Sequence, residues 1–240
     1  MKRWWFLTVG MLCGSVYAQS VVAPALKAGD SWVYVDTVET GPQGWSRKTV
    51  TVTVERVDGD SMLVANRQEG STQPAVEHLV GLDWSRTRDV NGKQEVVNRP
   101  LAFPLTQGKK WHVEYTEANP NRQHSSETIG DDYAVVGWED VQVPAGSFKA
   151  VKIEAQGQWS AIVAPGVTTD AHGQVNANGA LSVSQSQITR PHTVSGRLYK
   201  AFWYVPEQKR FVKSVEEYYD SKGVRSSRYT EELQSSKLAG

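Results

Sequence analysis

A strict alternation of apolar and polar residues is the strongest structural signal in this chain. In the segment KTVTVTVERV, residues 48–57, Val50, Val52 and Val54 alternate with threonine and glutamate. Successive side chains of a β-strand point to opposite faces of a sheet, so this period of two predicts a strand with one buried and one exposed face. No segment shows the long apolar period of 3.6 residues that predicts an amphipathic helix.

The alternating pattern recurs along the chain between short turn signals. Asn91-Gly92 is the strongest of these, because this dipeptide favours the two-residue turn of a β-hairpin. The stretch VPAGSFKAVKIE, residues 143–154, predicts another turn, in which Pro144 ends one strand and Gly146 lets the chain reverse. The spacing of these signals predicts roughly ten strands and little helix. We therefore expect a mainly-β fold, either a strongly curved antiparallel sheet or an incomplete β-barrel.

The first eighteen residues are typical of a secretory signal peptide. Lys2 and Arg3 precede an apolar run at 4–13 that is too short to cross a bilayer as a helix. Small side chains at the positions that a signal peptidase reads predict cleavage after Ala18, which makes Gln19 the mature N-terminus. The protein is therefore predicted to be exported, to the periplasm or out of the cell.

Cys13 raises the alternative of a lipoprotein, in which a lipid is attached to the cysteine. Lipid attachment prefers a small residue directly before the cysteine, and Leu12 stands there instead. Cleavage after Ala18 is the favoured interpretation.

The composition of the predicted mature chain excludes several classes of site. Residues 19–240 form one expected domain of 222 residues that contains no cysteine, which excludes disulfides, thiolate metal sites and cysteine nucleophiles. The 24 basic and 26 acidic residues give no basic patch of the kind that binds nucleic acid. No further apolar segment is long enough to form a transmembrane helix.

Residues 160–190 depart from the alternating pattern. They are poor in charge and rich in glycine, alanine, serine, asparagine and glutamine. We expect a flexible insertion here, either a mobile loop or a protruding irregular hairpin with Asn178-Gly179 at its turn. Long connections of this kind in compact domains are commonly functional or disordered.

No combination of residues predicts an active site. Ser147 lacks both the Gly-x-Ser-x-Gly pattern and a following helix, so we interpret it as a turn residue. The five histidines do not occur at the spacings of metal ligands. Adjacent carboxylates such as Asp131-Asp132 point to opposite faces of a strand and do not form an acid–base pair. We therefore expect no catalysis, no cofactor and no metal.

The aromatic residues are the best candidates for a binding site. The mature chain holds seven tryptophans and eight tyrosines. In LYKAFWYV, residues 198–205, Tyr204 lies on one face and Trp203 on the other, and both faces carry apolar side chains. Such a strand either lies between two layers or lines a cavity. We predict that Trp138, Trp159, Trp203 and Tyr204 form the wall of an apolar ligand cavity; the alternative is that these rings fill the core.

Three segments together resemble a known group of proteins: LKAGDSWVY, VPAGSFKAVKIE and FWYVPEQKRFVKSVEE. The combination resembles a large group of uncharacterised exported bacterial β-proteins of the domain-of-unknown-function type, over most of residues 26–220. More distantly, it is similar to the half-open β-barrels of the periplasmic lipoprotein carrier and outer-membrane lipoprotein receptor superfamily. That resemblance implies a curved antiparallel sheet around an apolar cavity that holds acyl chains.

Two functions are consistent with these features. The first is a non-catalytic periplasmic or secreted protein that binds or carries a hydrophobic ligand, such as a lipid or an acyl chain, in an aromatic-lined concavity. The alternative is a module for cell-envelope assembly or protein interaction, which contacts an envelope protein through a sheet edge or the 160–190 loop.

Overall fold

β-Strands make up most of the chain in the computed structural model, which describes residues 20–41, 44–176 and 179–240. A short 3-10 turn, η2 (Pro206–Gln208), links two of them. The strands are β1 (Ser31–Glu39), β2 (Trp45–Asp58), β3 (Ser61–Gln68), β4 (Val76–Gly81), β5 (Arg86–Val90), β6 (Lys93–Asn98), β7 (Lys110–Ala118), β8 (His124–Val143), β9 (Gly146–Val163), β10 (Gly166–Asn176), β11 (Gly179–Thr189), β12 (Thr193–Val205), β13 (Arg210–Tyr219) and β14 (Arg225–Lys237).

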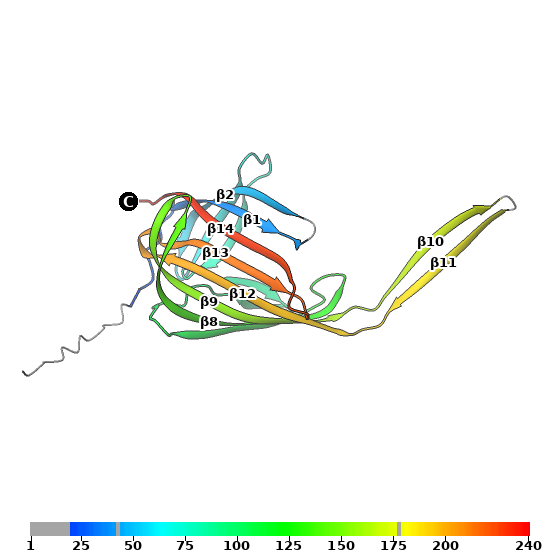
Figure 1. Ribbon diagram of the computed structural model, residues 1–240. Coiled ribbons are helices and arrows are strands. Elements are labelled where there is room, and N and C mark those ends of the chain that lie inside the picture. Colours follow the sequence, from blue (N-terminus) through cyan, green and yellow to red (C-terminus); the bar gives the residue numbers. More distant parts are fainter. Residues whose placement is uncertain (1–19, 42–43, 177–178) are drawn as a thin grey trace, which may run out of the picture.

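Twelve of these strands form one antiparallel sheet in the order β6-β5-β4-β3-β2-β1-β14-β13-β12-β9-β8-β7. Most neighbours are consecutive in the sequence, whereas β14 pairs with β1 and β12 pairs with β9. The sheet curves into a nearly closed, barrel-like shape (Figure 1). The predicted fold class is confirmed. The described residues contain fourteen strands instead of about ten, because a turn at Trp84 separates β4 from β5 and the expected insertion contains two further strands.

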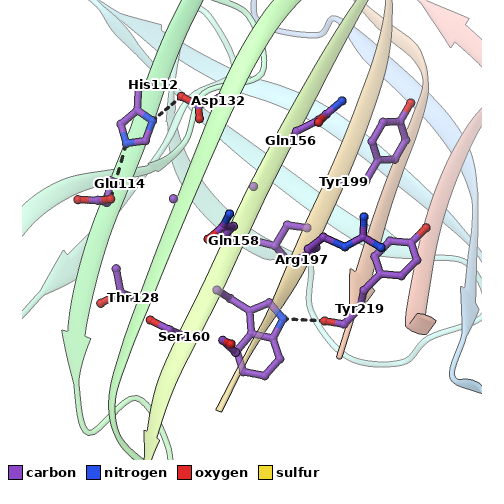
Figure 2. Close-up of a pocket in the computed structure, with 15 residues that line it drawn as sticks. His112, Glu114, Thr128, Asp132, Gln156, Gln158, Ser160, Arg197, Tyr199 and Tyr219 are labelled. Atoms are coloured by element: carbon purple, nitrogen blue, oxygen red, sulfur yellow. Dashed lines mark hydrogen bonds and ion pairs between the residues drawn. The ribbon is translucent and has the colours of Figure 1, made fainter. Parts of the chain in front are cut away.

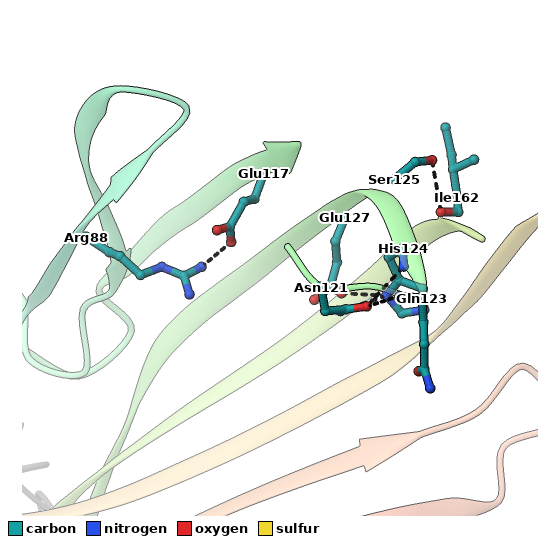
Figure 3. A network of polar contacts seen from close by, with 8 residues as sticks. All are labelled: Arg88, Glu117, Asn121, Gln123, His124, Ser125, Glu127 and Ile162. Carbon is teal, nitrogen blue, oxygen red and sulfur yellow. Dashed lines mark hydrogen bonds and ion pairs between the residues drawn. The ribbon is translucent and has the colours of Figure 1, made fainter. Parts of the chain in front are cut away.

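Side chains of β5 and of the β5–β6 turn contact β7, the strand at the opposite edge of the sheet. Asn91 Nδ2 donates to the carbonyl oxygen of Thr116 at 2.8 Å, and Asn91 Oδ1 accepts the backbone N–H of Ala118 at 2.8 Å. Figure 3 shows Arg88 and Glu117, whose side chains pair at 2.5 Å across the same seam. These contacts connect the two ends of the strand order through side chains, without a backbone ladder in the described sheet.

An apolar core built from most of the strands lies inside the curved sheet. Val50, Val52 and Val54 are all buried in it, as their alternation predicted. Fully burying a side chain of this size contributes about 1.5–3 kcal/mol, so the core supplies much of the stability of a chain without disulfides. The largest fully buried side chains include Trp32, Tyr34, Met62, Tyr133, Ile153, Tyr204 and Leu233.

The stretch at 143–154 forms the predicted turn. Val143 pairs with Gly146 at the end of the β8–β9 ladder, and Gly146 has a φ of 128°, which favours glycine. The backbone N–H of Ala145 donates to the carbonyl oxygen of Leu233 at 2.9 Å, so the turn is fixed to β14. Ser147 is exposed at this turn, as expected for a turn residue.

The segment expected to be an insertion contains paired strands. β10 and β11 form an antiparallel ladder that runs from Gly166 opposite Thr189 to Asn176 opposite Gly179. This hairpin extends away from the twelve-stranded sheet (Figure 1). The hairpin alternative therefore agrees with the structure, although Asn178, expected at its turn, lies outside the described residues.

The predicted signal region also lies outside the described residues, including Cys13 and the expected cleavage site between Ala18 and Gln19. Within the described part of the chain, no helix has the length and apolar character needed to span a membrane.

Candidate functional site

The pairing register aligns charged side chains along the inner face of the curved sheet. Asp36 on β1 lies opposite Glu231 on β14, and Glu231 lies opposite Ser214 on β13. Ser214 pairs in turn with Phe202 on β12, a member of the buried core. Directly opposed residues share one face of a sheet. This row therefore places two carboxylates inside the sheet, directly beside each other.

A buried ion pair lies in the next rows. Lys200 on β12 pairs in register with Glu216, and its Nζ donates to Asp131 Oδ2 at 2.6 Å. The Lys200 and Asp131 side chains are only 7% and 1% exposed. The glycine at 157 leaves room for this pair, because a Cβ there would lie 2.2 Å from Asp131 Oδ1 and 2.6 Å from the carbonyl oxygen of Gly130. A larger residue at 157 is therefore incompatible with the ion pair.

Two cavities, of about 330 Å³ and 440 Å³, adjoin the row of carboxylates. Four residues line both of them: Asn66, His78, Arg210 and Glu231. The smaller cavity has an additional apolar wall that includes Val64, Val80, Trp84, Phe202 and Phe211. The larger cavity is also lined by Tyr34, Asp36, Lys48 and Gln68. Both volumes fall within the range of small-molecule sites in proteins.

Arg210, at the start of β13, is the most unusual residue in the shared wall. It is 7% exposed, and its guanidinium carbon lies 4.0 Å from the ring centre of Trp84, 4.7 Å from that of Phe211 and 5.0 Å from that of Tyr34. Such cation–π contacts stabilise a buried guanidinium. Among the described residues, Arg210 has no carboxylate within 4 Å and its Nε has no hydrogen-bond partner. An arginine stays charged in proteins, so this cation is available to an anionic group.

The carboxylates in the cavity walls are poorly compensated. Burial, followed by the negative charge of Glu231, raises the pKa of Asp36 to about 7. Burial also raises the pKa of Glu216. Asp36 Oδ1 and Asn66 Oδ1 are buried without a hydrogen-bond donor in the described part of the chain. Buried polar atoms are normally satisfied, so these acceptors point to a missing donor.

Trp84 holds the Arg210 side of the smaller cavity in place. Its φ is 59°, a left-handed conformation that is rare for a bulky residue and costs on the order of 1–3 kcal/mol. The indole N–H donates to the carbonyl oxygen of Lys209 at 3.2 Å, and the ring packs edge-on against Trp32 with centroids 5.3 Å apart. The strained backbone thus presents the indole face to the guanidinium.

None of the four aromatic residues predicted as a cavity wall lines either interior cavity. Tyr204 is fully buried in the core against Phe103. Trp203 lies on the outer face of β12, where its Nε1 donates to Glu139 Oε1 at 3.2 Å. Trp138 packs against the core, and Trp159 lines a different concavity on the sheet.

That concavity, of about 750 Å³, lies mainly over the outer face of β7, β8, β9 and β12 (Figure 2). His112 Nδ1 and Asp132 Oδ1 are 2.8 Å apart at one side, and Arg197 stacks over the Tyr219 ring at 5.2 Å on the other. The His112 and Asp132 side chains are 52% and 83% exposed. These groups are solvated, so we place the candidate site in the interior cavities, where burial makes unpaired polar groups costly.

The interior charged residues had a signal in the sequence. Asp36 alternates in step with Trp32 and Tyr34, so it points to the same buried face of its strand. Lys200 lies between Leu198 and Phe202 on the face of β12 that was identified as apolar. Charged residues at buried-face positions of an alternating strand indicate an interior polar site. Arg210 and Trp84 come directly after or within turns, where the alternation of inward and outward side chains is interrupted. No local sequence pattern therefore predicts that they line the cavity.

Comparison with known proteins assigns no ligand to this site. No protein-family model matches the chain, and no curated protein matches it. A structure described as a "putative lipoprotein" from Parabacteroides distasonis is similar to 91% of this chain over its whole length, with 14% identity and a TM-score of 0.44. A "putative exported protein with YmcC-like fold" from Bacteroides fragilis also covers 91% of this chain over its own whole length, with 13% identity and a TM-score of 0.43. The resemblance to the lipoprotein-carrier superfamily stays a prediction.

We predict that Gly157→Ala destabilises the protein by about 1–3 kcal/mol, because the added methyl group displaces the Asp131–Lys200 pair and meets backbone. Gly130→Ala is the matched control, since its Cβ would meet only side chains, the end of Glu114 at 3.3 Å and the His112 ring at 3.7 Å. Urea unfolding of both variants measures the difference. Equal stabilities would contradict the role given to Gly157.

The second prediction concerns pH. Because the folded-state pKa of Asp36 lies above its unfolded value of 3.8, folding binds a proton between about pH 4 and pH 7, and this contribution to stability is lost as the pH rises through 7. Asp36→Asn removes the ionisation and should flatten the decline between pH 5 and pH 8 by about 2 kcal/mol, after a discount for partial exposure. Thermal melting of both proteins across this range tests it. A variant that declines as steeply as the wild type would refute the assignment.

Proposed function

We propose that this protein is a non-catalytic exported binding or carrier protein that holds a lipid or acyl chain inside its curved sheet. The observation that carries the proposal is the pair of interior cavities that share Arg210 and Glu231 in their walls. One cavity has an apolar wall that includes Trp84, Phe202 and Phe211, and both carry polar groups without partners. An apolar wall beside a few convergent polar groups is the usual lining of a ligand site.

The unpaired groups favour a ligand over a core that is merely loosely packed. A cavity left by imperfect packing is lined by apolar atoms and stays dry. Here the shared wall contains a buried guanidinium, an amide oxygen and a carboxylate. Each of these costs free energy when it lacks a partner, and a bound amphiphile supplies one. Export is supported by the signal-like leader, and the absence of catalysis by the lack of any catalytic motif in the sequence.

We expect a brominated fatty acid to quench the tryptophan fluorescence of the protein, because a chain in the smaller cavity lies against Trp84. Trp84→Phe should lose about half of the quenching or more. Trp45→Phe is the control, since Trp45 is 69% exposed and does not line either interior cavity. Titration of the three proteins at equal concentration measures the effect. Undiminished quenching in Trp84→Phe, or none in the wild type, would count against interior binding.

A second candidate function is an envelope interaction module. It is favoured by the β10–β11 hairpin, in which each strand pairs only with the other in the described ladder and so keeps one open edge. An open edge can pair with a strand of another protein.

Under this second function, deletion of residues 165–187 should abolish cross-linking to an envelope protein. The melting temperature should change little, because the hairpin forms a sheet of its own, separate from the twelve-stranded one. Cross-linking in cells, followed by melting of the purified variant, tests both points. An unchanged cross-linking pattern would eliminate this function.

A further inference from the structure

Two buried hydrogen-bond acceptors in the wall of the larger interior cavity have no donor among the described residues. Asp36 and Glu231 face each other in register, and Asp36 Oδ1 has no donor within the described residues. Asn66 Oδ1, in the same cavity wall, is also buried without a donor. Glu231 Oε2 accepts the hydroxyl of Ser214 at 3.0 Å. Like charges directly opposite each other on a sheet are destabilising, so this pair of carboxylates is unfavourable without a compensating cation.

The cations that the chain itself supplies compensate these acceptors poorly. Lys48 Nζ lies 4.0 Å from Asp36 Oδ2, and its side chain is 49% exposed, so the interaction is weak. Arg210 lines the same cavity but is stacked among aromatic rings, and its Nε is unpaired. His78 lines both interior cavities. Within the described residues, Asp36 Oδ1 and Asn66 Oδ1 therefore have no hydrogen-bond donor, and the Nε of Arg210 has no acceptor.

One kind of head group meets both needs. A primary ammonium has three N–H donors and no acceptor, which suits a cluster of carboxylate and amide oxygens. A phosphate or carboxylate beside it suits a guanidinium, with which it forms charge-assisted hydrogen bonds. We infer that the cavity takes a single-chain zwitterionic amphiphile, with its ammonium at Asp36, Glu231 and Asn66, its anionic group at Arg210, and its chain along Phe202 and Phe211. This inference rests on the proposed binding function and specifies the ligand class.

The decisive comparison is between head groups of equal charge and different hydrogen-bonding capacity. Lysophosphatidylethanolamine carries an ammonium with three donors, whereas lysophosphatidylcholine carries a methylated ammonium with none. Both are titrated into the full-length mature protein by calorimetry, with one dodecanoyl chain and below their micelle thresholds. Lysophosphatidylglycerol, which lacks the cation, and dodecylamine, which lacks the anion, complete the series. We expect the ethanolamine lipid to bind about tenfold more tightly than each of the others.

Two substitutions locate the effect. Glu231→Gln keeps the shape, removes one of two opposed charges, and should abolish the preference for ethanolamine over choline. Glu232→Gln is the matched control, because Glu232 is the next residue on the same strand and pairs with Lys213 at 2.7 Å instead. Arg210→Gln should reduce binding of the ethanolamine lipid to the level of dodecylamine. If that variant does not fold, the probe series and the Glu231 variant still decide the question.

The outcomes separate this inference from the binding function on which it rests. If the choline or glycerol lipid binds as tightly as the ethanolamine lipid, interior binding stands and the ammonium inference is wrong. If Glu231→Gln keeps the ethanolamine preference, the inference is also wrong. If none of the four probes binds the wild type, the interior binding function and the inference both fail.

Discussion

The buried ion pair between Lys200 and Asp131 determines how the inside of this sheet is organised. The two charges are almost completely removed from water and lie 2.6 Å apart, so removal of either leaves the other uncompensated, at a cost of about 3–5 kcal/mol. The pair excludes any side chain at position 157. It also stands between two different regions. Apolar residues such as Phe202 and Tyr204 continue along β12 into the core on one side, and aromatic residues such as Tyr218 line the other.

The positions of charged and apolar residues inside the sheet follow from the pairing register of the strands and not from the composition of the chain. Each residue of β12 from Leu198 to Tyr204 has a partner on β9 and another on β13, so an inward residue on one strand fixes the faces of its neighbours. The row through Phe202 and Ser214 includes Glu231 and Asp36, and the row through Lys200 includes Glu216 and Tyr229. A shift of one residue would turn these carboxylates outward. The position of the candidate site is thus a property of the whole sheet, including the side-chain contacts of Asn91 that connect the two ends of the strand order.

The sequence allowed the local structure to be predicted but not the register. Alternation placed Val50, Val52 and Val54 on a buried face, and the turn at Gly146 was recognised from its residues. Register depends on contacts between distant strands and on bulges, such as the shift between Trp203 and Tyr204. For this reason the sequence showed that these aromatic residues lie on apolar faces. It did not show which residues line the interior cavities.

The interior site could be predicted in part from the sequence. The parity of Asp36 with Trp32 and Tyr34 indicates a charged residue on a buried face. Its partner Glu231 comes from β14, about two hundred residues later, and the pairing of these two strands leaves no local signature. The role of Arg210 could not be predicted from the sequence either, because the aromatic rings around it come from β1, β13 and the turn before β5.

The charged interior is difficult to explain by stability alone. Replacing buried charged groups by apolar residues of similar volume is often neutral or stabilising. Here the opposed carboxylates raise the free energy of the fold, the left-handed backbone of Trp84 raises it further, and Arg210 is buried without a carboxylate partner among the described residues. Strain and uncompensated charge of this kind concentrate where a ligand restores the balance. Because all three features adjoin the same two cavities, a bound zwitterion would relieve the electrostatic costs at once, and binding would then be coupled to the stability of the whole sheet.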